Sequence, residues 1–325
     1  MKIKDTVISQ MNQLGKEEIP FLFILDFLLE KPVLIPLSSV NPKEILYDFN
    51  GNTNAVSGIL SSKSKIEYTC DPVSFPEYEK QFRAIQQEIS YGNTYLLNLT
   101  VETPLTINSS LQEIFYNSRA LYKLWMKDQW VCFSPETFVK IQDNRVETFP
   151  MKGTIDGNIP NAEEVILSDE KEAAEHYTIV DLLRNDLNLV AKKVKVDSFR
   201  HINTVHTPKG PLLQVSSHIT GELDSDWKEH LGDIFSTILP AGSVSGAPKE
   251  RTVEIINRVE TYSRGYYTGV AGIFDGNSVD TAVLIRFIEK KGDRYVYKSG
   301  GGITFSSDVE KEYQEIIQKI YVPTV

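Results

Sequence analysis

Two apolar runs on either side of an Asp-Gly pair constrain the fold of this chain most strongly. Residues 270–288 read VAGIFDGNSVDTAVLIRFI, and Asp275-Gly276 is a typical turn of a β-hairpin. Both faces of the second run are largely apolar, so this strand is expected to be buried. We therefore predict an antiparallel pair here, with Arg286 inside its second strand.

Strand and helix patterns alternate along the rest of the chain. Residues 21–27 and 32–37 are short apolar runs bounded by proline and charge, which is typical of strands. Apolar side chains recur three and four positions apart in residues 75–92, which predicts a helix. Further helices are predicted at 110–125, 168–191, 249–260 and 306–320. Hairpins mixed with long helices predict an α+β fold with largely antiparallel sheets.

Two of these helices carry start signals. Asp169 can cap the helix that begins near residue 168, and Glu172 falls three residues later. Ser307 and Glu310 form the same capping pattern at the start of the last helix. These patterns therefore mark the starts of both helices.

The charge and cysteine content exclude several classes of protein. The 325 residues carry a net charge of −10 with scattered lysine and arginine, which argues against nucleic acid or an anionic membrane as the main partner. Cys70 and Cys132 lie outside any metal-binding spacing, so no zinc site or disulfide framework is expected. The N-terminal residues lack a signal peptide, and the apolar stretch 21–29 is too short to span a bilayer. A cytoplasmic enzyme or binding protein is expected.

Three consecutive glycines lie between an apolar strand and the last helix. Gly300, Gly301 and Gly302 would let the backbone approach a ligand closely and direct N–H groups at an anion. A flexible turn is an equally good interpretation. The second glycine-rich segment, residues 242–249, does not have the spacing of a phosphate-binding loop.

Paired carboxylates recur on two of the predicted helices. Glu172 and Glu175 are three residues apart on one helix, and Glu312 and Glu315 repeat this spacing on the last. Oxygen ligands from two helices would suit Mg²⁺, which keeps several waters and bridges to an anionic substrate. The alternative is a solvated charged face with local ion pairs, such as Glu315 with Lys319.

Two cations have both an ordinary and a functional interpretation. Arg286 lies in a strand that is expected to be buried, so its guanidinium needs an anionic partner. That partner is Asp280, another side chain or a substrate carboxylate. Lys152 precedes Gly153 at a strand end, where lysine is normally a surface residue. If buried, it could lose its proton and act as a nucleophile. Among the histidines, only His176, which follows Glu175, is expected near a site.

Taken together and in order, several segments resemble those of the chorismate-utilising enzymes. This family includes anthranilate synthase component I, aminodeoxychorismate synthase component I, isochorismate synthase and salicylate synthase. The segments are SPETF (134–138), PMKGT (150–154), AEHYTIVDLLRNDL (174–187), AGSVSGAPKERTVEII (241–256), RGYYTG (264–269), the Arg286 strand and GGGITFSSDVEKEYQE (300–315). The N-terminal third matches more loosely, and residues 1–70 are the most divergent.

The resemblance implies one chorismate-binding domain over residues 1–325. Two large antiparallel sheets would pack roughly orthogonally with helices outside. Glu175 and Glu315 would bind Mg²⁺, with Glu312 near its waters. Glu136 would be the general acid or base near the ring hydroxyl. The residues implied to bind substrate are Gly153, Thr154, Tyr267, Arg286, Gly300, Gly301 and Gly302.

Lys152 selects among the members of this family. Anthranilate synthases carry alanine at this position, whereas aminodeoxychorismate synthases carry lysine, whose amine is proposed to attack ring C2 of chorismate. The resemblance thus implies amination of chorismate to 4-amino-4-deoxychorismate for 4-aminobenzoate and folate synthesis. A neutral lysine must attack, so we predict that burial lowers the pKa of Lys152.

No Cys-His glutaminase is recognisable, so a separate glutamine amidotransferase subunit would supply ammonia. Leu96 occupies the position of a basic lysine in the isochorismate and salicylate synthases, which disfavours water as the nucleophile. Gln214 stands where many members carry histidine. The alternatives are anthranilate synthase component I and a non-catalytic chorismate-binding subunit.

Overall fold

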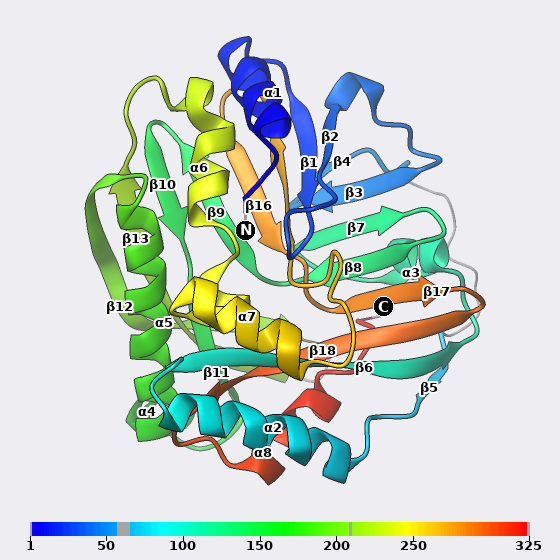
Figure 1. Cartoon of the computed structure of the whole chain (residues 1–325), viewed down its shortest axis with the longest axis vertical. Coiled ribbons are helices and arrows are strands. Elements are labelled where there is room, and N and C mark those ends of the chain that lie inside the picture. The colour runs from blue at the N-terminus through cyan, green and yellow to red at the C-terminus, as the bar shows by residue number, and fades with distance from the viewer. Residues whose placement is uncertain (1, 57–65, 208–209, 324–325) are drawn as a thin grey trace.

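A computed structural model describes residues 2–56, 66–207 and 210–323 of the chain. Within these residues two nine-stranded sheets are formed, and all their strand pairs are antiparallel. The strands of one sheet run mostly up the page in Figure 1, whereas those of the other run across it. The predicted α+β fold with two large, roughly orthogonal antiparallel sheets is therefore confirmed.

The first sheet contains the predicted hairpin. Its strands, in spatial order, are β11 (Met151–Asp156), β13 (Gly210–Glu222), β10 (Arg145–Thr148), β9 (Thr137–Gln142), β16 (Val279–Val283), β15 (Val270–Phe274), β1 (Phe21–Leu25) and β2 (Val33–Pro36), with β12 (Lys192–Thr207) paired to β13. The turn between β15 and β16 begins at Asp275, whose carboxylate accepts hydrogen bonds from the amides of Asn277 and Ser278. The Asp-Gly pair therefore lies in the turn of the predicted hairpin.

The second sheet holds the three consecutive glycines in a central strand. Its spatial order is β14 (Gly246–Ala247), β6 (Leu96–Ile107), β18 (Arg294–Thr304), β17 (Phe287–Lys291), β8 (Trp130–Ser134), β7 (Tyr122–Met126), β3 (Ile45–Phe49) and β4 (Asn52–Thr53), with β5 (Tyr68–Cys70) paired to β6. Gly300 to Gly302 lie within β18, which rules out the alternative interpretation of these glycines as a flexible turn.

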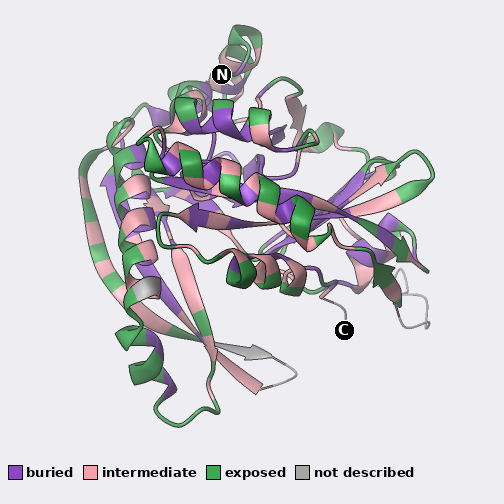
Figure 2. Ribbon diagram, turned by 60° about the horizontal axis from the view of Figure 1, so that its bottom comes forward, coloured by how far each residue is buried: buried purple, intermediate pink, exposed green. Residues whose placement is uncertain are grey.

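Helices cover the outer faces of both sheets. They are α1 (Asp5–Lys16), α2 (Phe75–Ser90), α3 (Leu111–Asn117), α4 (Ala162–Ser168), α5 (Glu170–Asn188), α6 (Leu231–Ile238), α7 (Lys249–Val259) and α8 (Val309–Gln318). Short 3₁₀ turns occur at Leu37–Ser39, Trp227–His230 and Gly242–Val244. In Figure 2 the helices turn buried positions inward and exposed positions outward. No helix in the described residues is both long and apolar enough to span a membrane.

The packing of β1 explains why its sequence is apolar at every position. Leu22 and Ile24 pack between the two sheets, against residues of β3, β7 and β8. Phe21, Phe23 and Leu25 face the opposite side, where α1 and α6 cover the first sheet. Burial on both faces removes the polar alternation expected of a half-exposed strand.

Three local predictions fail for identifiable physical reasons. The predicted helix at 110–125 ends at Asn117, because residues 122–126 pair with β3 and β8 and bury side chains on both faces. The last helix is capped by Asp308 rather than Ser307, since the Asp308 carboxylate accepts from the Lys311 amide. In contrast, Asp169 caps α5 as predicted.

The third failure concerns the strand assigned to Arg286. That strand ends at Val283, and the chain then crosses from the first sheet to β17 of the second. Arg286 lies in the crossing with a φ of 55°. The crossing therefore brings its side chain to the seam between the two sheets rather than into a continuous strand.

Candidate active site

A cavity of about 1430 Å³ lies where β6, β11, β18, α5 and α8 meet. It also receives the corner between β8 and β9 and the turn at residues 242–246. Segments far apart in the sequence therefore contribute to one site. The predicted residues that line it are Glu136, Lys152, Gly153, Thr154, Glu175, Tyr267, Arg286, Gly300, Gly302 and Glu315. Gly301 and Glu312 are not among its lining residues.

Lys152 and Glu175 form an ion pair across the cavity. Lys152 projects from β11 and Glu175 from α5, with 3.2 Å between Nζ and Oε2. Their side chains are 28% and 14% exposed. Gly153 has a φ of 77°, and a Cβ there would lie 3.1 Å from Glu172 Oε2, so glycine lets this strand approach α5 closely.

The prediction of a lowered pKa for Lys152 is wrong for this arrangement. Burial lowers the pKa of Lys152, but the negative charges of Glu175 and Glu315 outweigh burial and raise it. The charge of Glu172 also raises the pKa of Lys152. The amine is therefore held protonated by its neighbours, and it becomes a nucleophile only if that charge is neutralised.

The start of α8 brings two carboxylates close to β18. A Cβ on Gly301 would lie 3.6 Å from Glu312 Oε2 and 3.7 Å from Glu315 Oε1, so the glycine leaves room for both. Glu312 is only 2% exposed and sits behind the cavity surface. Glu315 lines the cavity, and its charge acts on Lys152.

Lys319 is a cavity residue that the sequence interpretation reduced to a local ion pair. Its Nζ lies 2.6 Å from Glu315 Oε1 and donates to the Gly300 carbonyl at 2.9 Å. Burial lowers the pKa of Lys319 more than Glu315 raises it. The spacing of four residues from Glu315 signalled the ion pair, but no sequence feature signalled the contact with β18.

The carboxylates of Glu175 and Glu315 have the chemistry that Mg²⁺ requires. Both offer hard oxygen ligands. They come from different helices, and the negative charge of each raises the pKa of Lys152. No three His, Cys, Asp or Glu side chains in the described residues are grouped closely enough to form a metal site. Two carboxylates nevertheless fit Mg²⁺, because this ion completes its shell with water and substrate oxygens.

The glycines of β18 present alternate amides to the cavity. The amides of Thr100 and Asn98 in β6 donate away from β18, to Glu260 and to the Ser245 carbonyl. Their register partners Gly300 and Gly302 are therefore non-hydrogen-bonded pairs, whose N–H groups point away from β6. Because β17 ends its pairing at Lys298, these two amides face the cavity.

Gly301 has the opposite orientation. It pairs with Leu99 in the β6 ladder, and it does not line the cavity. The predicted group of three amides is thus reduced by geometry to the two at Gly300 and Gly302.

Arg286 directs a positive charge at the cavity without a carboxylate partner. Its Nε donates to the Tyr321 hydroxyl at 3.2 Å, and its guanidinium lies 5.2 Å from the centre of that ring. Asp280, one of the partners considered from the sequence, instead pairs with Lys140 at 3.3 Å. No carboxylate of the described residues lies within ion-pair distance of Arg286. An anionic ligand in the cavity would satisfy it.

Glu136 has the properties of a proton donor. Its Oε1 accepts a hydrogen bond of 2.7 Å from Ser243 Oγ. Burial raises the pKa of Glu136 by more than the Ser243 hydrogen bond and the charge of Lys152 lower it. A carboxyl group with a raised pKa is suited to general acid catalysis near neutral pH.

The remaining predicted residues differ in their positions. Tyr267 lines the cavity, and burial raises the pKa of its hydroxyl, which therefore stays protonated and able to donate. Thr154 pairs with Gln214, and both line the cavity. Leu96 lines it as well. His176 instead points to β13, where its Nε2 lies 2.7 Å from Ser217 Oγ, so it is a structural residue.

Comparison with known proteins gives a consistent result. A model of the chorismate binding enzyme family matches residues 43–324. The chain is 48% identical over 316 residues to an uncharacterized PabA-like protein of Haemophilus influenzae, covering 97% of this chain and 96% of that protein.

Two more distant relatives have named activities. Aminodeoxychorismate synthase component 1 of Bacillus subtilis is 31% identical over 265 residues, covering 77% of this chain and 55% of the relative. The crystal structure of anthranilate synthase component I from Streptococcus pneumoniae superposes with a TM-score of 0.65 at 27% identity, covering 79% of this chain and 59% of that one. The chain therefore spans little more than half the length of these two relatives.

Proposed function

Because the chain belongs to the family of chorismate-binding enzymes, we propose that it replaces the C4 hydroxyl of chorismate with an amino group. The product is 4-amino-4-deoxychorismate, and the chain acts as aminodeoxychorismate synthase component I. The observation that carries this proposal is Lys152, whose amine faces the cavity where the anthranilate synthases are expected to carry alanine.

Substrate binding follows from the charges of the cavity. Arg286 has no carboxylate partner in the described residues, and Tyr267 keeps its proton. Together with the amides of Gly300 and Gly302, they bind the two carboxylates of chorismate. Thr154 and Gly153 line the wall beside the ring.

Lys152 then acts as a covalent catalyst. Its nitrogen bonds to ring C2, the two ring double bonds each shift one position, and the C4–O bond breaks. Glu136 gives its proton to the departing hydroxyl, which leaves as water. Ammonia bonds to C4, the double bonds shift back, and the C2–nitrogen bond to Lys152 breaks. A proton from the incoming nitrogen restores Glu136. This divides one difficult substitution into two easier ones.

Lys152 must lose its proton before the first step. Its pKa is raised by the negative charges of Glu175 and Glu315, both of which are the proposed ligands of Mg²⁺. When bound, the ion supplies positive charge that orients and neutralises a substrate carboxylate. When Glu175 and Glu315 act as ligands, their negative charges no longer stabilise the protonated amine of Lys152. Burial, which lowers the pKa of Lys152, is then the main influence on it.

We expect Glu175→Gln and Glu315→Gln each to weaken divalent cation binding by about 100-fold or more, since even outer partners of a metal ligand contribute 10–100-fold. Mn²⁺ binding followed by electron paramagnetic resonance measures this without turnover. Asp181→Asn is the matched control, because Asp181 lies on the same helix but pairs with Arg184 at the surface. Unchanged Mn²⁺ affinity in both glutamine variants would remove these residues from the metal site.

Ammonia is proposed to come from a separate glutamine amidotransferase subunit. The PabA-like name of the Haemophilus influenzae relative agrees with such a partner. Cys70 is exposed and Cys132 is buried, and neither lines the cavity. The chain is therefore proposed to use free ammonium when it acts alone.

Anthranilate synthase component I is the second candidate, favoured by the similarity to the Streptococcus pneumoniae enzyme. The two reactions differ in the fate of the enolpyruvyl group, which amination at C4 retains and anthranilate formation releases as pyruvate. We expect no pyruvate from chorismate, Mg²⁺ and ammonium until an aminodeoxychorismate lyase is added. A lactate dehydrogenase assay detects it, and pyruvate released without the lyase would favour the second candidate.

A further inference from the structure

A buried arginine outside the cavity connects segments that form the cavity wall. Arg264 follows α7 in the loop that leads to β15, and it is 3% exposed. Its guanidinium has five N–H groups, and the structure contains five hydrogen bonds from them. Nε donates to Glu260 at 2.9 Å, Nη2 to Glu260 at 2.6 Å and the Asn98 carbonyl at 2.5 Å, and Nη1 to the Val244 carbonyl at 2.8 Å and Thr268 Oγ1 at 3.3 Å.

Two of the acceptors, Asn98 and Val244, are distant from Arg264 in sequence, whereas Glu260 and Thr268 are each four residues away. Asn98 is in β6 and is the register partner of Gly302. Val244 is in the turn that also presents Ser243 to Glu136. Thr268 directly follows Tyr267. Asn98, Val244 and Tyr267 all line the cavity, whereas Arg264 does not. One guanidinium thus fixes three parts of the wall relative to one another.

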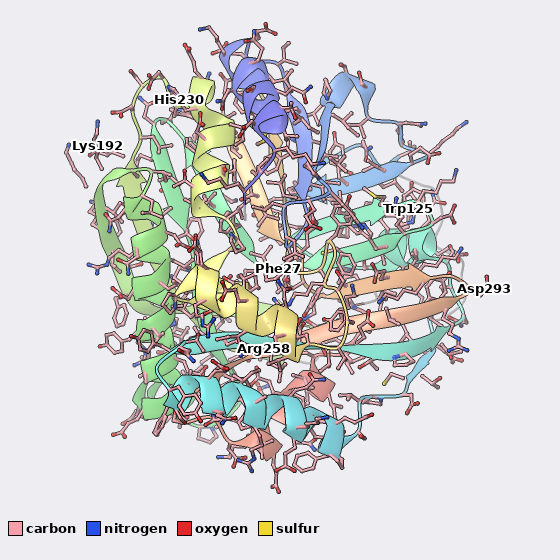
Figure 3. The ribbon with its side chains drawn as sticks, in the orientation of Figure 1. Phe27, Trp125, Lys192, His230, Arg258 and Asp293 are labelled. Atoms are coloured by element: carbon pink, nitrogen blue, oxygen red, sulfur yellow. The ribbon has the colours of Figure 1, made fainter. Side chains whose placement is uncertain are left out.

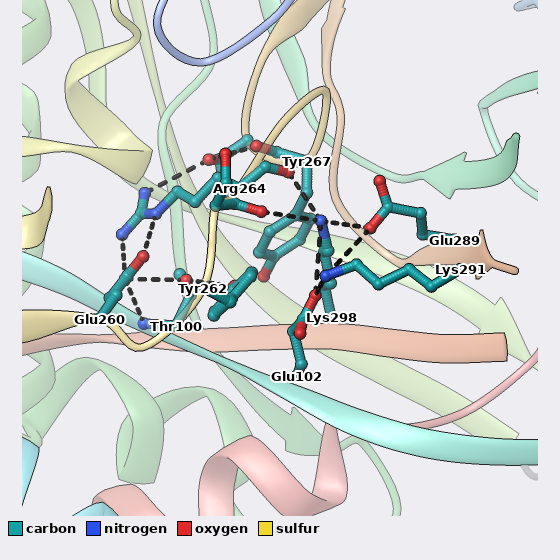
Figure 4. Close-up of polar contacts among 11 residues, drawn as sticks. Thr100, Glu102, Glu260, Tyr262, Arg264, Tyr267, Glu289, Lys291 and Lys298 are labelled. Carbon is teal, nitrogen blue, oxygen red and sulfur yellow. Dashed lines mark hydrogen bonds and ion pairs between the residues drawn. The ribbon is translucent and has the colours of Figure 1, made fainter. Parts of the chain in front are cut away.

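The charge of Arg264 is compensated where it lies. Glu260 is as fully buried as Arg264, and its carboxylate also accepts from the amide and hydroxyl of Thr100. The guanidinium lies 4.4 Å from the centre of the Phe27 ring. Figure 4 shows that this network is continuous with Tyr262. A buried ion pair with all its donors satisfied favours one arrangement of its partners over others.

A second buried cation holds the same loop from the other side. Lys298 has a fully enclosed side chain, and its Nζ donates to the Arg264 carbonyl at 2.8 Å. It is paired with Glu289 at 2.8 Å (Figure 4). The loop that carries Tyr267 is therefore held at Arg264 in two ways, through the Arg264 side chain and through the Arg264 carbonyl.

We propose that Arg264 is a positioning residue, which sets the spacing between Tyr267, the Ser243–Glu136 pair and the glycine amides of β18. This inference rests on the proposed function, because it takes the cavity as the chorismate site. Arg264 does not itself line the cavity, and it acts only through the groups that it holds. Lysine cannot replace it, because an ammonium has three donors and lacks the planar fork.

We expect Arg264→Lys to lower kcat/KM for chorismate by about 100-fold, the effect of a displacement of roughly 1 Å in a catalytic group. KM should rise and kcat should fall together, and calorimetry should show weaker binding of chorismate. Arg258→Lys is the matched control and should stay within about twofold. Arg258 lies six residues earlier, at the end of α7, and its side chain is 55% exposed (Figure 3).

Folding is checked by circular dichroism and thermal melting. Folded Arg264→Lys with kcat/KM within about twofold of wild type would overturn the proposal, even if its melting temperature is lower. Should that variant not fold, Thr268→Ala decides, since it removes one acceptor beside Tyr267. We expect this change to lower kcat/KM several-fold, and no change would equally overturn the positioning role.

The test also separates this inference from the proposed function. Wild-type protein that binds chorismate but forms no aminated product contradicts the proposed function alone. Equal chorismate affinity in wild type and folded Arg264→Lys contradicts the positioning role alone.

Discussion

Lys152→Ala is expected to lower formation of 4-amino-4-deoxychorismate from chorismate and ammonium by at least about 10³-fold, because removal of a covalent nucleophile usually has an effect of this size or larger. The change removes the amine that faces Glu175 in the cavity. It should affect kcat more than KM, since Arg286 and the glycine amides still bind the carboxylates. Product formation is followed by liquid chromatography at saturating ammonium.

A second readout addresses the covalent step itself. Wild-type protein incubated with chorismate and Mg²⁺ without ammonium should gain the mass of chorismate less one water, and Lys152→Ala should not. Lys140→Ala is the matched control, because Lys140 has a similar exposure and pairs with Asp280 at 3.3 Å outside the cavity. Undiminished product formation by Lys152→Ala would exclude a nucleophilic lysine.

Arg286→Met is expected to lower kcat/KM for chorismate by roughly 10²–10³-fold, mainly through KM. Loss of one member of a buried, hydrogen-bonded charge pair costs about 2–5 kcal/mol, and each 1.36 kcal/mol is tenfold. Arg286 has no carboxylate partner in the described residues, so its charge is available to the substrate. Methionine keeps an unbranched, uncharged side chain and the same backbone constraint at a positive φ.

The comparison with Arg286→Lys separates charge from geometry. Lysine keeps the charge but not the planar fork, so we expect an intermediate kcat/KM. Arg294→Met, on the exposed start of β18, should behave as wild type. If Arg286→Met retains the wild-type KM for chorismate, the guanidinium does not bind a substrate carboxylate.

Local patterns predicted much of the fold. The Asp-Gly hairpin, the Asp169 cap of α5 and the apolar periodicity of α2 depend on neighbouring residues, and all are found in the structure. Residues 122–126 were misassigned because burial on both faces of β7 removes the alternation of a half-exposed strand, so its pattern does not distinguish strand from helix. The strand break before Arg286 depends on the crossing between sheets, which no local pattern encodes.

Most of the predicted site residues line the cavity, although Gly301 and Glu312 do not, and the electrostatics of the site were not predicted. Motif resemblance named the residues that the structure gathers around one cavity. The pKa of Lys152 depends on Glu175 and Glu315, which are distant in sequence, so its direction could not be predicted from burial alone. Arg264 was given no role, because two of the residues that it holds, Asn98 and Val244, are distant from it in sequence.

The identity of the product is the most direct test of the proposed function. Purified protein is incubated with chorismate, Mg²⁺ and isotopically labelled ammonium at mildly alkaline pH, and the products are identified by mass spectrometry. We expect a labelled product that has exchanged the C4 hydroxyl for an amine and retains the enolpyruvyl group. Labelled anthranilate, or unlabelled isochorismate, would contradict amination at C4 and the role given to Lys152.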